Sequence, residues 1–208
     1  MVRRSALPNG LRIVTEPLDG VPSVTIGIWV ESGSRFEPPH LGGISHFLEH
    51  LLFKGTARRT AAQIAEEMDA VGGVLNAFTG KEYTCYYARV LAEHAPLAMD
   101  LLADLFLHSR LDADEIDRER TVVLQEISQS EDTPDDYIHD LFNSHYWPSH
   151  PLGRPVCGTS ATVQTIRKRP TRSGGQGIDR SWCPRYSTAV QASDSRVSTN
   201  RQSRRPMR

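Results

Sequence analysis

The chain of 208 residues carries 24 Lys and Arg against 25 Asp and Glu, so its net charge is −1, and 38% of it is hydrophobic. No apolar run reaches the roughly 18 residues of a membrane-spanning helix, and no apolar segment follows the basic start at residues 1–4, so neither a membrane span nor a secretory signal is predicted. Three widely spaced cysteines form no Cys-x-x-Cys, which favours reduced thiols over a metal or redox pattern: Cys85, Cys157 and Cys183.

Two strands and a helix are predicted in the first third of the chain. Residues 12–16 suit a strand, and residues 23–30 alternate four aliphatic side chains with Thr25, Gly27 and Trp29. Trp29 makes the second face of that strand partly apolar, which favours burial on both faces. Between the glycine pair at 42–43 and Gly55, apolar residues recur at helical spacing, so this segment is predicted to be helical.

The next elements are a short helix, a hairpin and three longer helices. Thr60 is an N-cap candidate for a helix that ends near Gly72. Residues 72–80 and 82–90 are predicted to be adjacent strands joined by a turn at Gly80–Lys81. Helical patterns then cover residues 93–107, 112–127 and 135–146. This order of strands and helices indicates an α+β fold rather than alternating βαβ units.

His46, Glu49 and His50 form a His-x-x-Glu-His pattern within the first predicted helix. Imidazoles at i and i+4 lie one turn apart on one helix face, where they supply half of a tetrahedral zinc site. The neighbouring carboxylate of Glu49 is placed to handle a proton of a metal-activated water. The alternative is a structural cluster, which is disfavoured because two His and a Glu on a largely apolar helix are costly to bury without a partner.

Glu119 and Glu126 offer carboxylates on the predicted helix over residues 112–127. They are seven positions apart, so they share one helix face. On a surface helix such a pair is ordinary, and taken alone it does not indicate a site. The six remaining histidines lack a partner at ligand spacing and are expected at surface or cap positions: His40, His94, His108, His139, His145 and His150.

These motifs together resemble the N-terminal half of a pitrilysin/insulinase zinc peptidase, closest in pattern to the mitochondrial-processing-peptidase β-type branch and its bacterial relatives. The His-Phe-Leu-Glu-His order is the inverted zincin motif of that family. Glu126 lies 76 positions after His50, at the spacing of the family's glutamate ligand. Residues 7–14, 76–79 and 151–155 also resemble the family, and the match runs from about residue 7 to residue 166.

The resemblance implies a role for each of these residues and a fold. His46, His50 and Glu126 bind one zinc ion, Glu49 is the general base, and Glu119 supports the site from behind the ligands. The implied fold is α+β, a mixed or antiparallel sheet covered by helices, which forms the metal-bearing half of a clamshell and is incomplete at its C-terminus. A homologous C-terminal half or partner subunit then closes the site.

The resemblance also implies where substrate lies. An extended peptide or unfolded polypeptide adds as an extra strand beside the predicted strand over residues 72–80, so Asn76 and Ala77 are candidates for substrate contact. The alternative is an ordinary hairpin with Asn76 in a turn.

The last 42 residues differ in composition from residues 1–166. Residues 167–208 hold ten Arg and one Lys against Asp179 and Asp194, a net charge of +9, and contain no Leu and no Phe. Such a segment cannot bury enough apolar surface to offset its ordering entropy, so a disordered tail is expected. Its abrupt start inside the family pattern favours a shifted reading frame over the alternative of a basic arm for anionic partners.

The predicted function is a zinc-dependent endopeptidase of the bacterial cytoplasm, weakly active or inactive in this form. No membrane or nucleic-acid partner is expected, since the Arg-rich segment lacks the interleaved aromatic residues of a base-stacking surface. The alternative is a non-catalytic scaffold subunit of the same family. Such subunits lose the metal motif, whereas all four motif residues are present here.

Overall fold

The computed structural model describes residues 1–167 and the backbone of residues 189–193. In chain order its elements are β1 (Arg3–Ala6), β2 (Arg12–Glu16), β3 (Ser23–Val30), η1 (Ser34–Phe36), η2 (Pro39–Leu41), α1 (Ile44–Leu52), α2 (Ala61–Asp69), β4 (Val74–Thr79), β5 (Thr84–Leu91), η3 (Ala92–His94), α3 (Ala95–His108), α4 (Ala113–Asp132), α5 (Pro134–Tyr146), η4 (Pro151–Gly153), α6 (Ser160–Thr165) and β6 (Ala189–Ser193).

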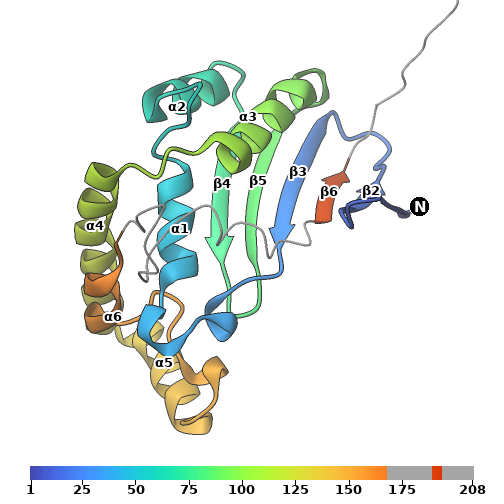
Figure 1. The fold of residues 1–208 in the computed structure, drawn as a ribbon. Helices are drawn as coiled ribbons and strands as arrows, with labels where there is room; N and C mark the ends of the chain where they lie inside the picture. Colours follow the sequence, from blue (N-terminus) through green and yellow to red (C-terminus); the bar gives the residue numbers. More distant parts are fainter. Residues whose placement is uncertain (168–188, 194–208) are drawn as a thin grey trace, which may run out of the picture.

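The strands form one mixed sheet in the order β1-β2-β6-β3-β5-β4. All neighbouring pairs are antiparallel except β2 and β6, which run parallel. Strand β4 ends the sheet, and α1 and α4 lie beyond it (Figure 1). The fold is therefore the predicted α+β arrangement of a largely antiparallel sheet with helices packed on it.

Two hydrophobic clusters hold these layers together. The first joins β3 and β5 to α2 and α3 through residues such as Val30, Ala88 and Leu101, each fully buried. The second joins α1 to α4 and α6 through residues such as Phe47, Val123 and Val163. Helix α1 contributes to both, because Leu52 packs in the first cluster and Phe47 in the second. Burying each large apolar side chain stabilises the fold by about 1.5–3 kcal/mol, so α1 is fixed along its whole length.

Most predicted elements lie where the sequence indicated. Strands β2 and β3 match residues 12–16 and 23–30, and the aliphatic face of β3 is buried while Thr25 and Trp29 are half-buried. Thr60 begins α2 with a capping box: its hydroxyl accepts from the Gln63 amide at 3.2 Å and its own amide donates to the Gln63 side chain at 2.9 Å. Strand β1 and the short helix α6 were not predicted.

The Arg-rich tail lies mostly outside the described residues, and so does Cys183. Residues 189–193 differ from the expectation of a tail without regular structure, because their backbone forms β6 between β2 and β3. That position satisfies the hydrogen-bonding groups that β2 and β3 would otherwise leave open. Within the described residues, no helix combines the length and hydropathy that a membrane crossing requires.

Candidate metal centre

Helix α1 presents both histidines of the motif on one side. Its apolar residues point into the core, so His46 and His50 are turned toward α4, with ring centroids 4.7 Å apart. Each side chain keeps some exposure, 14% for His46 and 18% for His50. The helical spacing therefore produces the predicted pair of neighbouring imidazoles, open on one side.

Helix α4 brings Glu126 to this pair. Glu126 Oε2 lies 3.7 Å from His46 Nε2 and 3.4 Å from His50 Nε2, and one ligand atom from each residue falls within 4.8 Å of the others. Ligand atoms bonded at about 2 Å to one tetrahedral ion are separated by about 3–4 Å, so this spacing suits a shared cation. It is the only such group of three among the residues that the structure describes.

Glu119 lies behind the ligands rather than among them. Its Oε2 is 3.1 Å from His50 Nδ1, and its Oε1 accepts from Lys54 Nζ at 2.7 Å, with only 5% of the side chain exposed. A proton on His50 Nδ1 bonded to this carboxylate leaves Nε2 as the lone-pair atom facing Glu126. Such carboxylate–histidine pairs fix the tautomer and orientation of ligating imidazoles.

His46 is held differently. Burial, reinforced by neighbouring His50, lowers its pKa to about 4, so the ring is neutral near pH 7 and available as a ligand. Its buried Nδ1 has no hydrogen-bond partner in the described part of the chain. The orientation of His46 is consequently set by packing and by the backbone of α1.

Glu49 lies on α1 between the two histidines and contacts the sheet. Thr79, the last residue of β4, donates its hydroxyl to Glu49 Oε2 at 2.5 Å. Burial raises the pKa of Glu49, and this hydrogen bond opposes the rise. A carboxylate with an upward-shifted pKa beside a cation site suits proton transfer.

Cys157 is a thiol close to the site. Burial raises its pKa to about 11, and the negative charges of Glu126, Asp140 and Glu49 act in the same direction. With that pKa the Cys157 side chain is a neutral thiol at pH 7, whereas metal ligation requires the thiolate.

Asn76 and Ala77, the candidate substrate contacts, lie in the middle of β4 rather than in a turn. The strand has no partner on its outer edge among the described residues. The Ala77 amide donates to Asn76 Oδ1 at 2.8 Å, so a side chain satisfies this backbone donor.

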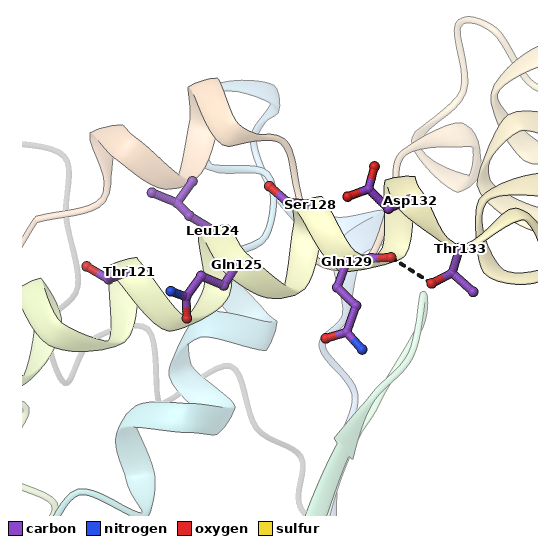
Figure 2. Close-up of a pocket in the computed structure, with 7 residues that line it drawn as sticks. All are labelled: Thr121, Leu124, Gln125, Ser128, Gln129, Asp132 and Thr133. Carbon is purple, nitrogen blue, oxygen red and sulfur yellow. Dashed lines mark hydrogen bonds between the residues drawn. The ribbon is translucent and has the colours of Figure 1, made fainter.

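Helix α4 also borders a separate shallow hollow of about 580 Å³, which is lined mostly by polar side chains (Figure 2): Thr121, Leu124, Gln125, Ser128, Gln129, Asp132 and Thr133. Within it the Thr133 hydroxyl donates to the Gln129 carbonyl at 2.7 Å. None of the candidate ligands or Glu49 lines this hollow.

Two residues in contact with the site were not predicted from the sequence: Lys54, which pairs with Glu119, and Thr79, which pairs with Glu49. Lys54 lies four positions after His50, a spacing that could have indicated a shared helix face. Thr79 reaches Glu49 across 30 positions, and no local pattern signals that contact.

The sequence of this chain is similar to a family of known peptidases. Residues 12–160 match the model of the insulinase family, peptidase family M16. The chain is 52% identical over 166 residues to an uncharacterized zinc protease of Bacillus subtilis, YmxG, covering 80% of this chain and 41% of that protein. It is 53% identical over 165 residues to an uncharacterized zinc protease of Streptomyces coelicolor, covering 79% and 36%. The chain therefore spans about two fifths of the length of these relatives.

Solved structures show the same fold. A protease from Helicobacter pylori superimposes with a TM-score of 0.83 at 24% identity, covering 95% of this chain and 47% of that one. An inactive M16 peptidase domain from Pseudomonas fluorescens superimposes with a TM-score of 0.77 at 13% identity, covering 93% and 46%. With a family model that matches most of its length and a fold shared with these structures, the chain belongs to the insulinase family of peptidases, M16.

Proposed function

We propose that residues 1–166 form the metal-bearing half of a zinc-dependent endopeptidase, with His46, His50 and Glu126 as ligands of one zinc ion. The observation that carries this proposal is the convergence of two imidazole nitrogens and a carboxylate oxygen within 4.8 Å. Two His and one Glu match the three-ligand sets of catalytic zinc sites, which keep a further position open. The neutral state of His46 and the protonated thiol of Cys157 agree with this donor set.

A zinc ion bound there supplies Lewis acidity, which lowers the pKa of water toward about 7 and polarises a peptide carbonyl. Glu49 accepts a proton from water as the oxygen attacks the carbonyl carbon, and it returns that proton to the amine nitrogen when the C–N bond breaks. Thr79 holds Glu49 Oε2 during these transfers. Glu119 orients His50 and is in turn held by Lys54.

The proposed substrate is an extended peptide that pairs with the outer edge of β4. Antiparallel addition to an open strand reads backbone groups more than sequence, which suits a peptidase for unfolded polypeptides. On this hypothesis the peptide displaces Asn76 Oδ1 from the Ala77 amide and takes over that hydrogen bond. Thr79, at the end of the same strand, is hydrogen-bonded to Glu49, so the peptide-binding strand and the proposed general base are held together.

Efficient turnover is proposed to need a second half that covers this face. The chain spans 41% of the Bacillus relative and 47% of the Helicobacter protease, so more than half of each lies outside the match. Enclosure excludes water and orients the peptide, and much of the rate enhancement depends on both. We place the activity in the bacterial cytoplasm, where free thiols such as Cys85 stay reduced.

The competing proposal is a non-catalytic scaffold of the same fold, since the Pseudomonas structure shows that this fold occurs in an inactive M16 domain. The complete donor set and the Thr79–Glu49 contact favour the enzyme, because a scaffold has no need of either.

The decisive experiment measures cleavage of a quenched fluorescent peptide by the chain mixed with the C-terminal half of an M16 relative. We expect zinc-dependent cleavage that is lost when Glu49→Gln is introduced, because an amide cannot accept the proton of water at neutral pH. The Glu49→Gln chain should still bind zinc, since Glu49 is not a ligand. Near-normal turnover by that variant would refute its role as general base.

A further inference from the structure

The first turn of α1 is capped by a residue from outside the helix. Glu37 lies in the loop between η1 and η2 and is only 5% exposed. Its Oε2 accepts from the Gly43 amide and its Oε1 from the Ser45 amide, both at 2.7 Å. Both carboxylate oxygens are therefore committed to backbone donors at the start of the helix that carries the two candidate histidine ligands.

The local sequence cannot provide this cap itself. The N-cap residue of α1 is Gly43, which adopts φ +91 and makes no side-chain cap. A Cβ at this position would meet the Cys157 carbonyl oxygen at 2.4 Å, so the usual capping residues Ser, Thr, Asp and Asn do not fit. The close approach of residues 42–43 to 157–158 excludes a local cap, and Glu37 replaces it.

The backbone carbonyl of Glu37 is also hydrogen-bonded. Arg154 donates Nη1 to the Glu37 carbonyl oxygen at 2.7 Å, and Lys81 donates Nζ to the Arg154 carbonyl oxygen at 2.7 Å. These two hydrogen bonds connect the cap to the loop after η4 and to the β4–β5 turn. The backbone of Glu37 is thus tied through Arg154 to the β4–β5 turn, while its carboxylate holds the start of α1.

We infer that Glu37 is a positioning residue for zinc binding, acting through the first turn of α1 on His46. This inference rests on the proposed zinc site. His46 follows Ser45 directly, and its Nδ1 has no partner in the described part of the chain. His50 is instead oriented by Glu119. The Glu37 carboxylate thus acts on His46 through the backbone amides of Gly43 and Ser45, whereas Glu119 contacts the His50 ring directly.

The test compares the zinc dissociation constants of the intact 208-residue chain and its Glu37→Gln variant, measured by competition with a chelator of known affinity. Gln keeps the size of Glu but offers one oxygen acceptor for two amide donors. We expect the dissociation constant to rise at least about tenfold, the lower range for loss of a group that orients a ligand. The d–d absorption of the cobalt(II)-loaded chain should change as well, because the His46 ring is displaced.

Asp104→Asn is the matched control. Asp104 is also buried, at 1% exposed, but it lies on α3 and is hydrogen-bonded to Thr56, Arg59 and His108, none of which is a candidate ligand. This variant should lose comparable thermal stability while keeping its zinc dissociation constant within about twofold of the parent, since sites without shared partners act independently.

An unchanged zinc affinity in a folded Glu37→Gln chain overturns the inference, and so does equal weakening in both variants. If Glu37→Gln does not fold, Arg154→Met decides, because it loosens the Glu37 backbone and keeps the carboxylate. A weaker zinc affinity in that variant supports the inference, and an unchanged one overturns it. If the parent chain itself binds no zinc, the proposed metal site fails first and this inference with it.

Discussion

At the scale of single residues, the proposed chemistry depends on groups that are partly buried and that each have a hydrogen-bond partner. His50 is oriented by Glu119, Glu49 by Thr79, and Glu119 by Lys54. The candidate ligands were predictable because their spacing is a property of the helix and of the family pattern. The holding residues were not, because each contact depends on how α1, α4 and β4 pack rather than on neighbouring positions in the sequence.

Thr79→Val should lower kcat for peptide cleavage roughly tenfold and leave KM and zinc affinity nearly unchanged. Val has the shape of Thr without the hydroxyl that donates to Glu49, and positioned acid–base groups contribute about 10²–10⁴-fold to rate, of which orientation is a part. Thr79→Ser keeps the hydroxyl and serves as the control. The measurement is steady-state kinetics of the complemented chain, and equal kcat values for Val and Ser would contradict this role.

At the scale of elements, the loop after α1 is tied to α3 through Asp104. Its carboxylate accepts from Thr56, Arg59 and His108, while Asp100 accepts from Arg58 and Arg59. Burial alone would raise the pKa of Asp104, but hydrogen bonds from Thr56, Arg59 and His108 outweigh it and the pKa is lowered. This network joins the segment that contains Thr56 and Arg59 to α3.

Asp104→Asn should reduce the free energy of unfolding by about 1.5–3 kcal/mol, the range for losing a hydrogen bond to a charged group. Arg59 loses one carboxylate partner in this variant and keeps Asp100 and Glu67. The sign of the pH dependence follows from the lowered pKa. Stability from Asp104 is fully present above its unfolded pKa, near 4, and is lost as pH falls through the lower folded value. Urea unfolding between pH 6 and pH 3 measures both effects, and a variant with the acid sensitivity of the parent would argue against the network.

Substitutions at Gly43 and Gly72 allow the cost of backbone strain to be compared with the cost of a steric contact. Both have positive φ, +91 and +62, but only Gly43 faces a close neighbour, the Cys157 carbonyl oxygen. Gly72→Ala should cost about 1–2 kcal/mol, the usual penalty for a left-handed residue with a Cβ. Gly43→Ala should cost clearly more, since α1 must also move away from Cys157. Chemical denaturation of the two variants tests this, and equal losses would show that the contact at Gly43 is unimportant.

Most secondary structure was predictable because apolar periodicity matches burial in β3, α1 and α3. The glycine pair at 42–43 indicated the start of α1 in the sequence. Glycine is required there because the backbone of residues 157–158 approaches closely, a tertiary contact that the sequence does not show. Strand β6 was not predictable, since its place depends on two distant strand edges rather than on an apolar pattern of its own.

At the scale of the whole molecule, the described residues leave large apolar side chains open on α5. No residue of this helix is buried, and its large hydrophobic side chains are 36–64% exposed, with Phe142 stacked on Tyr146. The outer edge of β4, which has no strand partner among the described residues, is a second open surface. Exposed apolar side chains and an open strand edge favour association or aggregation, which agrees with a chain that spans less than half of its relatives.

The chain alone should therefore cleave a quenched fluorescent peptide at least about 10²-fold more slowly than the chain complemented with an M16 C-terminal half, since orientation and water exclusion come from both sides. Robust zinc-dependent turnover by the chain alone would contradict this account of the second half.

The proposal of a shifted reading frame after residue 166 has its own test: an alternative frame of the gene should encode a continuation of the family pattern.

The most direct test of the proposed metal centre is zinc K-edge X-ray absorption of the zinc-loaded chain. The proposed ligand set predicts one zinc per chain with nitrogen and oxygen neighbours at about 2.0–2.2 Å, scattering from two imidazoles and no sulfur at about 2.3 Å. His46→Ala should remove one imidazole contribution. A sulfur neighbour from a cysteine, or an unchanged spectrum in the His46→Ala chain, would contradict the assignment of His46, His50 and Glu126 as the ligands.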